Sequence, residues 1–267
     1  MKLKHMVITL LLAASTAWAG PFEDAVAAYE SKDYVAAAKG FRLAAAQGDA
    51  DAQVILGAMY ANGEGVIQDY AEAVKWTRLA AVQGNASAQL NLGVMYAKGQ
   101  GVVQDYAEAV KWYRLAAAQG DADAQFNLGV RYATGQGVVQ NYADAVKWYR
   151  LAAAQGNADA QFNLGARYAN GQGVVQNYAE AVKWYRLAAA QGNASAQVNL
   201  GVMYATGEGV VQDYVRAHMW FNLASVKGDP DAKNARDLAA SKMTPQQIAE
   251  AQKRASECLA RDFKGCK

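Results

Sequence analysis

Apolar and polar positions along this chain follow a helical spacing, and the pattern itself repeats every 36 residues. Five complete units cover 49–84, 85–120, 121–156, 157–192 and 193–228, and the third and fourth differ at only four positions. A fixed period of roughly 20–50 residues is typical of stacked supersecondary units. The period is marked most plainly by Trp76, Trp112, Trp148, Trp184 and Trp220.

Each unit predicts two helices joined by a glycine-containing loop. The first helix, A-x-A-Q-x-x-L-G-x-x-Y, follows an Asp or Asn that can cap its free N–H groups, and it ends at a Gly suited to a left-handed cap. The loop G-x-G-V-x-Q leads to a second helix, in which Asp69 and Glu72 have the spacing of a capping box. One unit cannot bury its own apolar face, so we expect an all-α solenoid of stacked helical hairpins.

The two ends of the repeat array have a different pattern. Residues 20–48 contain a shortened unit with a short loop in place of the glycine-rich one, and we expect it to cap the stack. Residues 229–267 predict capping helices that cover the last repeat as a polar lid. There Thr244, Pro245 and Gln247 predict the start of a helix that runs to about Arg261.

Residues 1–19 have the pattern of a secretory signal peptide. Lys2 and Lys4 begin a basic segment, an apolar run of nine residues follows, and Ala17-Trp18-Ala19 fits a cleavage site before Gly20. An uncleaved buried helix is the alternative. The apolar run is too short to span a bilayer, so we expect export, with the periplasm as the destination and secretion as the alternative.

The repeated pattern L-G-x-x-Y-x-x-G-x-G-V followed by A-x-x-W-x-x-x-A-A-x-x-G resembles the Sel1-like repeat (SLR) family. That resemblance implies a right-handed superhelix of hairpins related to tetratricopeptide repeats. It also implies a role as an adaptor scaffold, since family members include exported bacterial regulators and proteins that meet host cells. The resemblance covers residues 21–255 and names a class of role without naming a partner.

Composition and net charge limit the classes of partner that this chain is expected to bind. The chain is 53% apolar and 19% charged, which is typical of a folded protein. Removing Lys2 and Lys4 with the signal segment leaves 24 basic and 24 acidic side chains. A neutral chain has no net electrostatic attraction to nucleic acid or anionic lipid, so we expect neither partner. No later segment is long and apolar enough to span a bilayer, so we expect no membrane segment in the mature chain.

Few side chains suit catalysis. His218 is the one histidine of the mature chain and stands where other units have Val, so we expect it to be packed in the core. Cys258 and Cys266 are the only cysteines, and in an exported protein they predict a disulfide that stabilises the fold by about 2–3 kcal/mol at most. A redox-active pair is the alternative. This set lacks the ligands of a zinc site, so we expect no metal and no cofactor.

The first helices carry the residues that differ between units. Positions 51, 55, 59 and 62 share one helix face, and these positions are not fixed by stacking. In tetratricopeptide-like solenoids the first helices line the concave surface, where ligands bind. The predicted partner-binding residues are Asn91, Met95, Asp123, Asn127, Arg131, Asp159, Asn163, Arg167, Asn199 and Met203.

This face predicts a groove with a run of Asn, two central Arg and Met at both ends. Met offers adaptable apolar contact and Arg binds carboxylates. The alternative is a solvated polar face in which Arg131 and Arg167 pair with Asp123 and Asp159.

We therefore expect an exported, monomeric, non-catalytic scaffold that binds a protein or peptide, in cell-envelope regulation or in host contact. One alternative is a periplasmic enzyme or binder that acts on β-lactams or cell-wall peptides, as linked to SLR relatives with a cysteine pair in each repeat. The repeats of this chain contain no cysteine. A second alternative is a glycan-binding module, suggested by the many Tyr and Trp.

Overall fold

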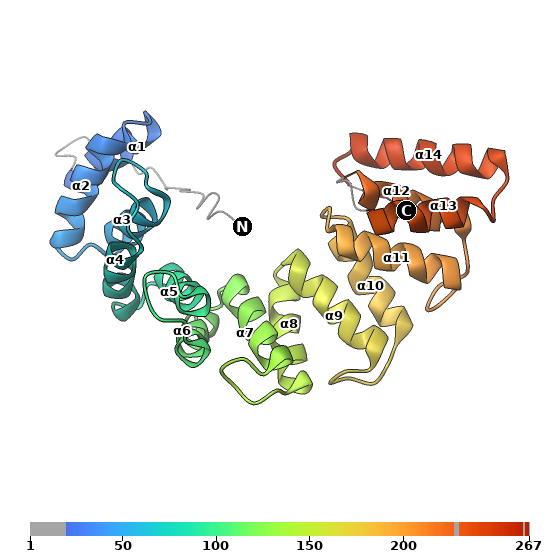
Figure 1. Ribbon diagram of the computed structural model, residues 1–267, viewed down its shortest axis with the longest axis horizontal. Helices are drawn as coiled ribbons and strands as arrows, with labels where there is room; N and C mark the ends of the chain where they lie inside the picture. The colour runs from blue at the N-terminus through green and yellow to red at the C-terminus, as the bar shows by residue number, and fades with distance from the viewer. Residues whose placement is uncertain (1–19, 227–229, 264, 267) are drawn as a thin grey trace. The chain divides into compact units, whose positions relative to one another are not determined.

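The computed structural model describes residues 20–226, 230–263 and 265–266, and the predicted signal peptide lies outside these ranges. The described residues form fourteen helices and no strand, which confirms the all-α prediction (Figure 1). The helices are α1 (Pro21–Glu30), α2 (Tyr34–Ala46), α3 (Ala50–Asn62), α4 (Tyr70–Val82), α5 (Ala86–Lys98), α6 (Tyr106–Ala118), α7 (Ala122–Thr134), α8 (Tyr142–Ala154), α9 (Ala158–Asn170), α10 (Tyr178–Ala189), α11 (Ala194–Thr206), α12 (Tyr214–Ser225), α13 (Pro230–Ala240) and α14 (Pro245–Ala260).

The described chain divides into two compact units. The N-terminal unit comprises the described part of Met1–Ala124 together with Gln136–Val138. The C-terminal unit comprises Gln125–Gly135 and the described part of Val139–Lys267. Within each unit, consecutive helices pack as hairpins around cores made of Ala, Leu and aromatic side chains.

The predicted helix caps are present. At the start of α9, the Asn157 side chain accepts a hydrogen bond from the Ala160 N–H at 2.8 Å, and Asp49 caps α3 in the same way. The helix ends at Gly171, whose φ of 65° lies in the left-handed region that favours glycine. Local sequence therefore sets both ends of the first helices.

The expected capping box at Asp69 is only half made. The Asp69 side chain accepts hydrogen bonds from the N–H groups of Ala71 and Glu72, as predicted. However, the Asp69 N–H donates to the Tyr60 carbonyl at 3.0 Å, so the Glu72 carboxylate is not needed there. Glu72 instead accepts a hydrogen bond from the Trp76 indole at 3.1 Å, one helical turn later.

A glycine in each first helix allows the hairpin to close. In the C-terminal unit, a Cβ added to Gly129 of α7 would come within 2.7 Å of the Tyr149 ring of α8. Such a distance is shorter than a van der Waals contact, so any larger residue would push the two helices apart. Tyr149 is only 1% exposed, and its ring fills the space that the glycine leaves.

The second glycine of each loop meets the preceding repeat. A Cβ on Gly173 would lie 2.3 Å from the Tyr142 carbonyl at the start of α8. The same glycine has a φ of 75°. Both the close approach and the left-handed backbone require glycine at this position. The loop is therefore a structural contact between repeats.

A hydrogen-bonded pair of glutamines also joins adjacent repeats. The buried Gln161 side chain donates to the Ala153 carbonyl at 3.1 Å, and its own carbonyl accepts from Gln191 at 2.9 Å. Gln191 donates further to the Gly156 carbonyl at 2.9 Å. The same glutamine pair recurs as Gln83 with Gln53, Gln119 with Gln89, and Gln155 with Gln125.

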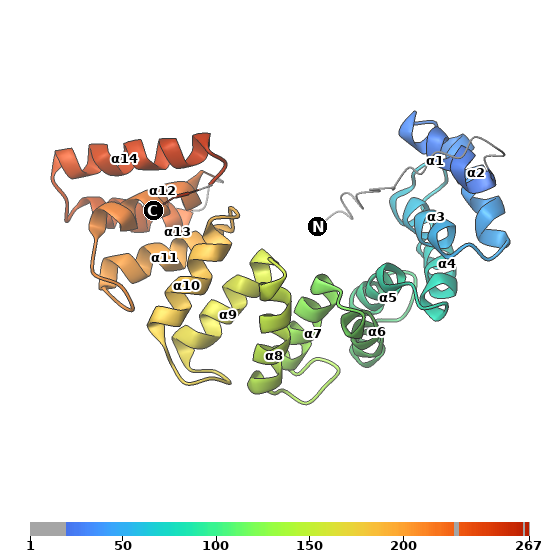
Figure 2. The same cartoon turned by 180° about the vertical axis from the view of Figure 1, so that it is seen from behind.

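The two ends of the described chain are covered by different helices. At the N-terminus α1 packs on α2, with the rings of Phe22 and Phe41 in edge-to-face contact. At the C-terminus α12 contacts both α13 and α14, so that Trp220 is 2% exposed, whereas the Trp of each earlier repeat is partly exposed (Figure 2). Thr244 forms the predicted capping box with Gln247 at the start of α14.

The C-terminal tail returns to the last repeats. Cys258 and Cys266 form a disulfide, with their Cα atoms 5.4 Å apart. Within that loop, the Phe263 ring covers Gly192 in the turn between α10 and α11. None of the described helices is both long enough and apolar enough to cross a membrane.

We predict that Gln161→Leu lowers the free energy of unfolding by about 2–4 kcal/mol, because it leaves the Ala153 carbonyl without its donor and removes one of the two acceptors of the Gln191 amide. Urea denaturation measures the change. The double variant Gln161→Leu/Gln191→Leu should cost less than the two single changes together, because it removes both side chains of the pair. Strict additivity would contradict the inferred pairing.

Candidate functional site

The described geometry places seven of the ten predicted partner-binding residues in the C-terminal unit. They belong to the first helices α7, α9 and α11. Asn91, Met95 and Asp123 belong to the N-terminal unit, so each unit is considered by itself. The seven residues of the C-terminal unit are Asn127, Arg131, Asp159, Asn163, Arg167, Asn199 and Met203.

The asparagines lie half-buried on the first helices. The Asn163 amide donates to the Asp159 carbonyl at 2.8 Å, and the Asn199 amide donates to the Ser195 carbonyl at 2.9 Å. Each amide nitrogen is therefore tied to its own helix, one turn back. This bond fixes the direction of the side chain and turns its carbonyl oxygen away from the helix backbone.

The Arg167 guanidinium is held in place by two neighbours. Its Nη1 donates to the Gln172 side chain at 2.5 Å, and its centre lies 5.2 Å from the centroid of the Tyr142 ring. Stacking on an aromatic face and a hydrogen bond at one edge restrict the rotamers of the side chain. A positive charge held in this way binds an anion at a smaller entropic cost than a freely moving one.

Two buried phenols lie close to these arginines. Burial raises the pKa of Tyr149 to about 12, while the positive charges of Arg167 and Arg131 act in the opposite direction. Burial likewise raises the pKa of Tyr185 to about 12, with Arg167 opposing it. Both phenols are therefore neutral at physiological pH, and they add no negative charge to the face that carries Arg131 and Arg167.

The contacts of Asp159 bear on the alternative in which Arg131 and Arg167 form ion pairs with nearby Asp side chains. The carboxylate of Asp159 accepts a hydrogen bond from the side chain of Asn193 at 2.9 Å, the cap of the next first helix. Asp51 and Asn85 form the same contact in the N-terminal unit at 3.0 Å. The Asp at this position thus joins successive first helices, and Arg167 bonds to Gln172 instead.

The two methionines differ from expectation. Met95 is 5% exposed and Met203 is 6% exposed, so both side chains belong to the core. These two positions therefore present little apolar surface, and their role in partner binding stays a prediction. Methionine is flexible enough to fill the gaps between helices, and burial of its side chain is the more favourable outcome. Asn91 is half-buried and Asp123 is exposed.

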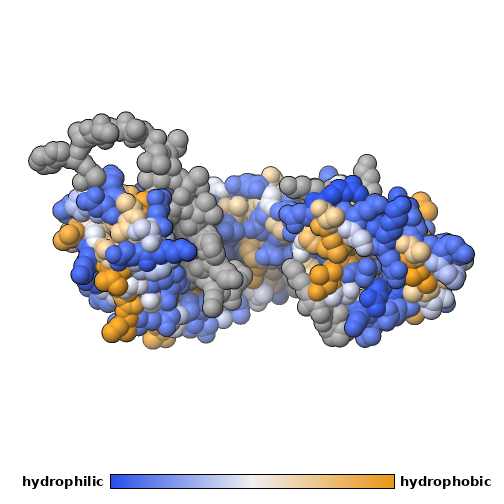
Figure 3. Space-filling model, turned by 90° about the horizontal axis from the view of Figure 1, so that it is seen from above, coloured by the Kyte–Doolittle hydropathy of each residue, from blue (hydrophilic) through white to orange (hydrophobic). Residues whose placement is uncertain are grey.

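The sequence pattern did not predict one group of exposed apolar residues, which lies in the loops between the two helices of each repeat. The second aliphatic residue of each G-V-x-Q loop is 88–91% exposed, whereas the preceding Val packs against a core cluster, as Val66, Val102, Val174 and Val210 do. The face seen in Figure 3 is mostly hydrophilic and carries separate apolar patches. Single exposed apolar side chains are ordinary on protein surfaces. The exposed loop residues are Ile67, Val103, Val139, Val175 and Val211.

His218 lies in the core, as the sequence predicts. It is 3% exposed, on α12 beside the capping helices. Burial and, secondarily, the positive charge of Arg236 lower the pKa of His218 below its ordinary value, while Asp237 acts in the opposite direction. Among residues 20–226, 230–263 and 265–266, no three His, Cys, Asp or Glu side chains come together as ligands for a metal ion.

Five consecutive segments match the Sel1 repeat family, at 50–85, 86–121, 122–157, 158–193 and 194–229. The chain belongs to the Sel1 repeat family. Each match begins one residue after the capping Asp or Asn of a repeat, at the first residue of the first helix. Sel1 repeat proteins are in general protein-interaction scaffolds, which agrees with the class of role that the sequence implies.

Two solved structures of Sel1 repeat proteins resemble this chain. One is c5321, a protective antigen of uropathogenic Escherichia coli with an SLR fold; it is 38% identical, with a TM-score of 0.81, and the match covers 91% of this chain. The chain spans only 54% of the length of that antigen. The other, a Sel1 repeat protein from Oxalobacter formigenes, is 32% identical, with a TM-score of 0.78, covering 88% of this chain and 97% of that one. No curated protein is significantly similar to this chain.

We predict that acid destabilises the C-terminal cap through His218. Because burial lowers the folded-state pKa, the neutral form is favoured in the folded protein, and the stabilisation is complete above the ordinary pKa of 6.5. It should be lost as the pH falls below 6.5 towards the folded-state pKa. The matched control is His218→Val, which installs the residue of the other repeats. Thermal melts between pH 8 and pH 4 should show a steeper loss for the natural protein than for this variant.

Proposed function

We propose that this chain is an exported, non-catalytic scaffold that binds a protein partner through the first-helix face of its C-terminal unit. Arg131 and Arg167 bind carboxylates of an extended acidic segment in that partner, and Asn127, Asn163 and Asn199 supply hydrogen bonds along it. The partner serves a role in the cell envelope or in contact with a host. The chain acts as a monomer.

One observation carries this proposal: residues on the first-helix face differ between repeats, while framework residues of the same helices do not. Leu164 and Gly165 recur in every repeat because the hairpin needs them, while the residue at position 167 is Arg in two repeats and Met in three. Stacking does not require the arginine, because the Met repeats pack in the same way. A charge placed where packing is satisfied by Met is available for another purpose.

The geometry supports recognition of a carboxylate. Arg167 keeps its position through Tyr142 and Gln172, and only one of its Nη atoms is used by Gln172. A guanidinium has five N–H donors in a planar fork that matches a carboxylate. Arg131 lies one repeat away on the same helix face, so an extended peptide that runs along the stack meets both charges.

Two features support export. Residues 1–19 have the three-part pattern of a signal peptide, and the mature chain begins in this proposal at Gly20. The chain also has a disulfide between Cys258 and Cys266, and disulfides persist in oxidising compartments, among them the bacterial periplasm. We assign the disulfide a structural role, since it holds the tail against the last repeats.

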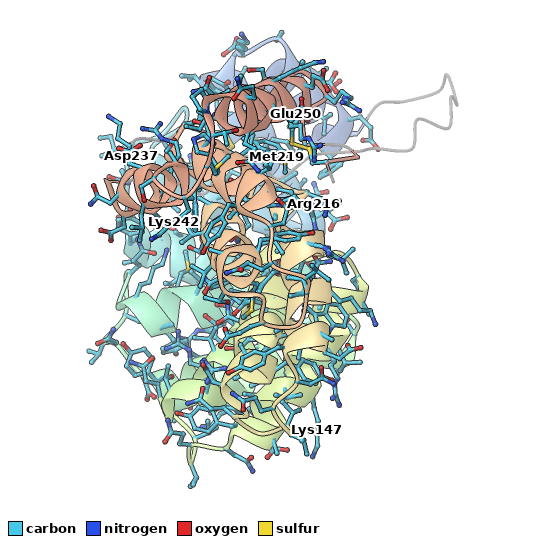
Figure 4. The ribbon with its side chains drawn as sticks, turned by 90° about the vertical axis from the view of Figure 1, so that its right-hand side faces the viewer. Lys147, Arg216, Met219, Asp237, Lys242 and Glu250 are labelled. Carbon is cyan, nitrogen blue, oxygen red and sulfur yellow. A yellow bond between two sulfur atoms is a disulfide. The ribbon has the colours of Figure 1, made fainter. Side chains whose placement is uncertain are left out.

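We predict that Arg131→Glu/Arg167→Glu reduces partner binding at least tenfold, because it replaces two attractive charges with two repulsive ones. The test is affinity capture from an envelope extract with residues 20–267, followed by identification and titration of the captured protein. The matched control is Lys147→Glu/Lys183→Glu. It makes the same change of charge in the same two repeats, on the exposed second helices; Figure 4 labels Lys147 at the surface of α8.

Circular dichroism must first show that both double variants remain helical. Binding that survives the Arg variant, or that is lost equally in the Lys variant, would contradict the proposed site. In the natural protein, binding should also weaken as salt rises from 50 mM to 500 mM, since added ions screen exposed charges. A partner held equally at both salt concentrations would contradict recognition of an acidic segment.

A further inference from the structure

Arginines of the second helices contact tyrosines of the following first helices in both units. Arg78 of α4 donates through Nη2 to the Tyr96 hydroxyl of α5 at 2.6 Å, and its guanidinium carbon lies 5.7 Å from the centroid of that ring. Arg150 of α8 makes the same two contacts with Tyr168 of α9, at 2.7 Å and 5.7 Å. These contacts, here called the Arg–Tyr pairs, are Arg42 with Tyr60, Arg78 with Tyr96, Arg150 with Tyr168, and Arg186 with Tyr204.

The arginines of the Arg–Tyr pairs are exposed, yet the direction of each side chain is fixed. The contact with the ring and the hydrogen bond to the phenol together restrict the rotamers of the arginine and the plane of its guanidinium. A side chain that is already ordered loses less conformational entropy when it binds a ligand. The pairs therefore present pre-oriented positive charges to the solvent.

These arginines are not neutralised, in contrast to the lysines on the same helices. Lys75, Lys147 and Lys183 each form an ion pair with an acidic residue one turn earlier, as Lys75 does with Glu72 at 3.0 Å. Arg78 follows Lys75 by three residues and has the Tyr96 hydroxyl as its partner instead. Among the residues that the structure describes, none of the four arginines forms an ion pair with a carboxylate.

Each Arg–Tyr pair offers hydrogen-bond donors and little capacity to accept. A guanidinium has five N–H donors, and the contact with the phenol uses one of them. The phenol oxygen accepts that hydrogen bond, so its own O–H remains a donor, and no acceptor for the Tyr96 O–H is found within the described part of the chain. Donors on two neighbouring side chains suit a group that only accepts. Sulfate and phosphate groups have three outer oxygens and can accept from both side chains at once.

We propose that the Arg–Tyr pairs bind sulfate or phosphate groups of a linear polysaccharide. Each unit has two pairs at the same position of successive repeats, so the pairs of one unit fit anionic groups that recur along a polymer. The proposal does not rest on the proposed function, since it uses the arginines of the second helices and requires no protein partner.

Two observations favour a polysaccharide over other polyanions. Nucleic acids carry one charge at every nucleotide, and proteins that bind them need an excess of basic side chains. Residues 20–267 contain 24 basic and 24 acidic side chains, so this excess is absent. An acidic peptide brings carboxylates with two oxygens each, and its backbone N–H groups need acceptors that the Arg–Tyr pairs do not supply. A sparsely charged sugar chain meets neither difficulty.

The test measures the binding of heparin, a linear polysaccharide rich in sulfate groups, to residues 20–267 by calorimetry at about 150 mM NaCl. Heparin should bind in a saturable way, and roughly tenfold or more tightly than desulfated heparin, which keeps the sugar chain and the carboxylates. Absence of saturable heparin binding, or equal binding of the desulfated chain, would overturn the proposal.

Two further probes separate the possible sources of the anionic groups. Poly-L-glutamate carries carboxylates on a peptide chain, and duplex DNA carries phosphates on a nucleic acid. Both should bind more weakly than heparin at the same salt concentration. Poly-L-glutamate that binds as tightly as heparin would assign this surface to an acidic protein, and DNA that does so would assign it to a nucleic acid. Either result would overturn the polysaccharide.

A pair of charge-matched variants locates the binding surface. Arg78→Gln/Arg150→Gln/Arg186→Gln should weaken heparin binding roughly tenfold or more, because it removes three guanidinium groups that no carboxylate neutralises. Lys75→Gln/Lys147→Gln/Lys183→Gln removes the same charge from the same three helices and should weaken binding about twofold or less, because carboxylates already neutralise these lysines. Circular dichroism checks that both variants remain helical. An equal loss in the two variants would show attraction by net charge alone and would overturn the assignment.

Two milder changes test the pair itself and disturb the helices less. Arg78→Lys/Arg150→Lys/Arg186→Lys keeps the charge and loses the planar fork, so heparin binding should weaken roughly threefold or more. Tyr96→Phe/Tyr168→Phe keeps both rings and every charge, and it removes the hydroxyl that orients the arginine and donates to the ligand. It should weaken heparin binding at least about twofold. Unchanged binding in both variants would overturn the Arg–Tyr pair as the binding unit.

Discussion

The stack depends on a buried hydrogen bond that crosses from one repeat to the next. Gln161 reaches the Ala153 carbonyl at the end of the preceding hairpin and at the same time accepts from Gln191. A buried amide must have both of its groups satisfied, and only one register of neighbouring hairpins achieves this. Apolar packing among alanines tolerates small shifts of one hairpin along the next. The directional hydrogen bond therefore fixes the register that the alanine surfaces alone do not determine. The caps, loops and exposed faces of each repeat then take their positions from this register.

A consequence for function is that the outer surface is free to vary. Because Gln, Gly and Leu positions maintain the repeat, the residues on the first-helix face are limited only by the need to remain helical and partly buried. Arg167 illustrates both demands, since its guanidinium stacks on the Tyr142 ring and the residue is only partly buried. The proposed binding residues thus differ between repeats that share one framework.

Much of the fold could be predicted from the sequence because its determinants are local. Capping Asp and Asn, the terminal glycines and the Thr244–Gln247 box act within a few residues, and each is found where its residues predict. The candidate site was less predictable, since face assignment by helical spacing gives direction but not depth. Met95 and Met203 have the predicted direction and are nevertheless covered by neighbouring helices. The role expected of Glu72 failed for a related reason. The Asp69 N–H donates to the Tyr60 carbonyl, which lies nine residues earlier in the sequence, and residue spacing alone does not show this contact.

Because the third and fourth repeats are nearly identical, the chain can lose or gain a whole repeat without changing the contacts between its neighbours. Loss of residues 157–192 would bring Gln197 to the Ala153 carbonyl that Gln161 now occupies, with the same residue type on both sides of the new junction. Gain of a copy would do the same in reverse. The gene can therefore expand or contract in blocks of 36 codons while every junction keeps its hydrogen bonds, and the number of repeats along the array becomes a heritable quantity in its own right.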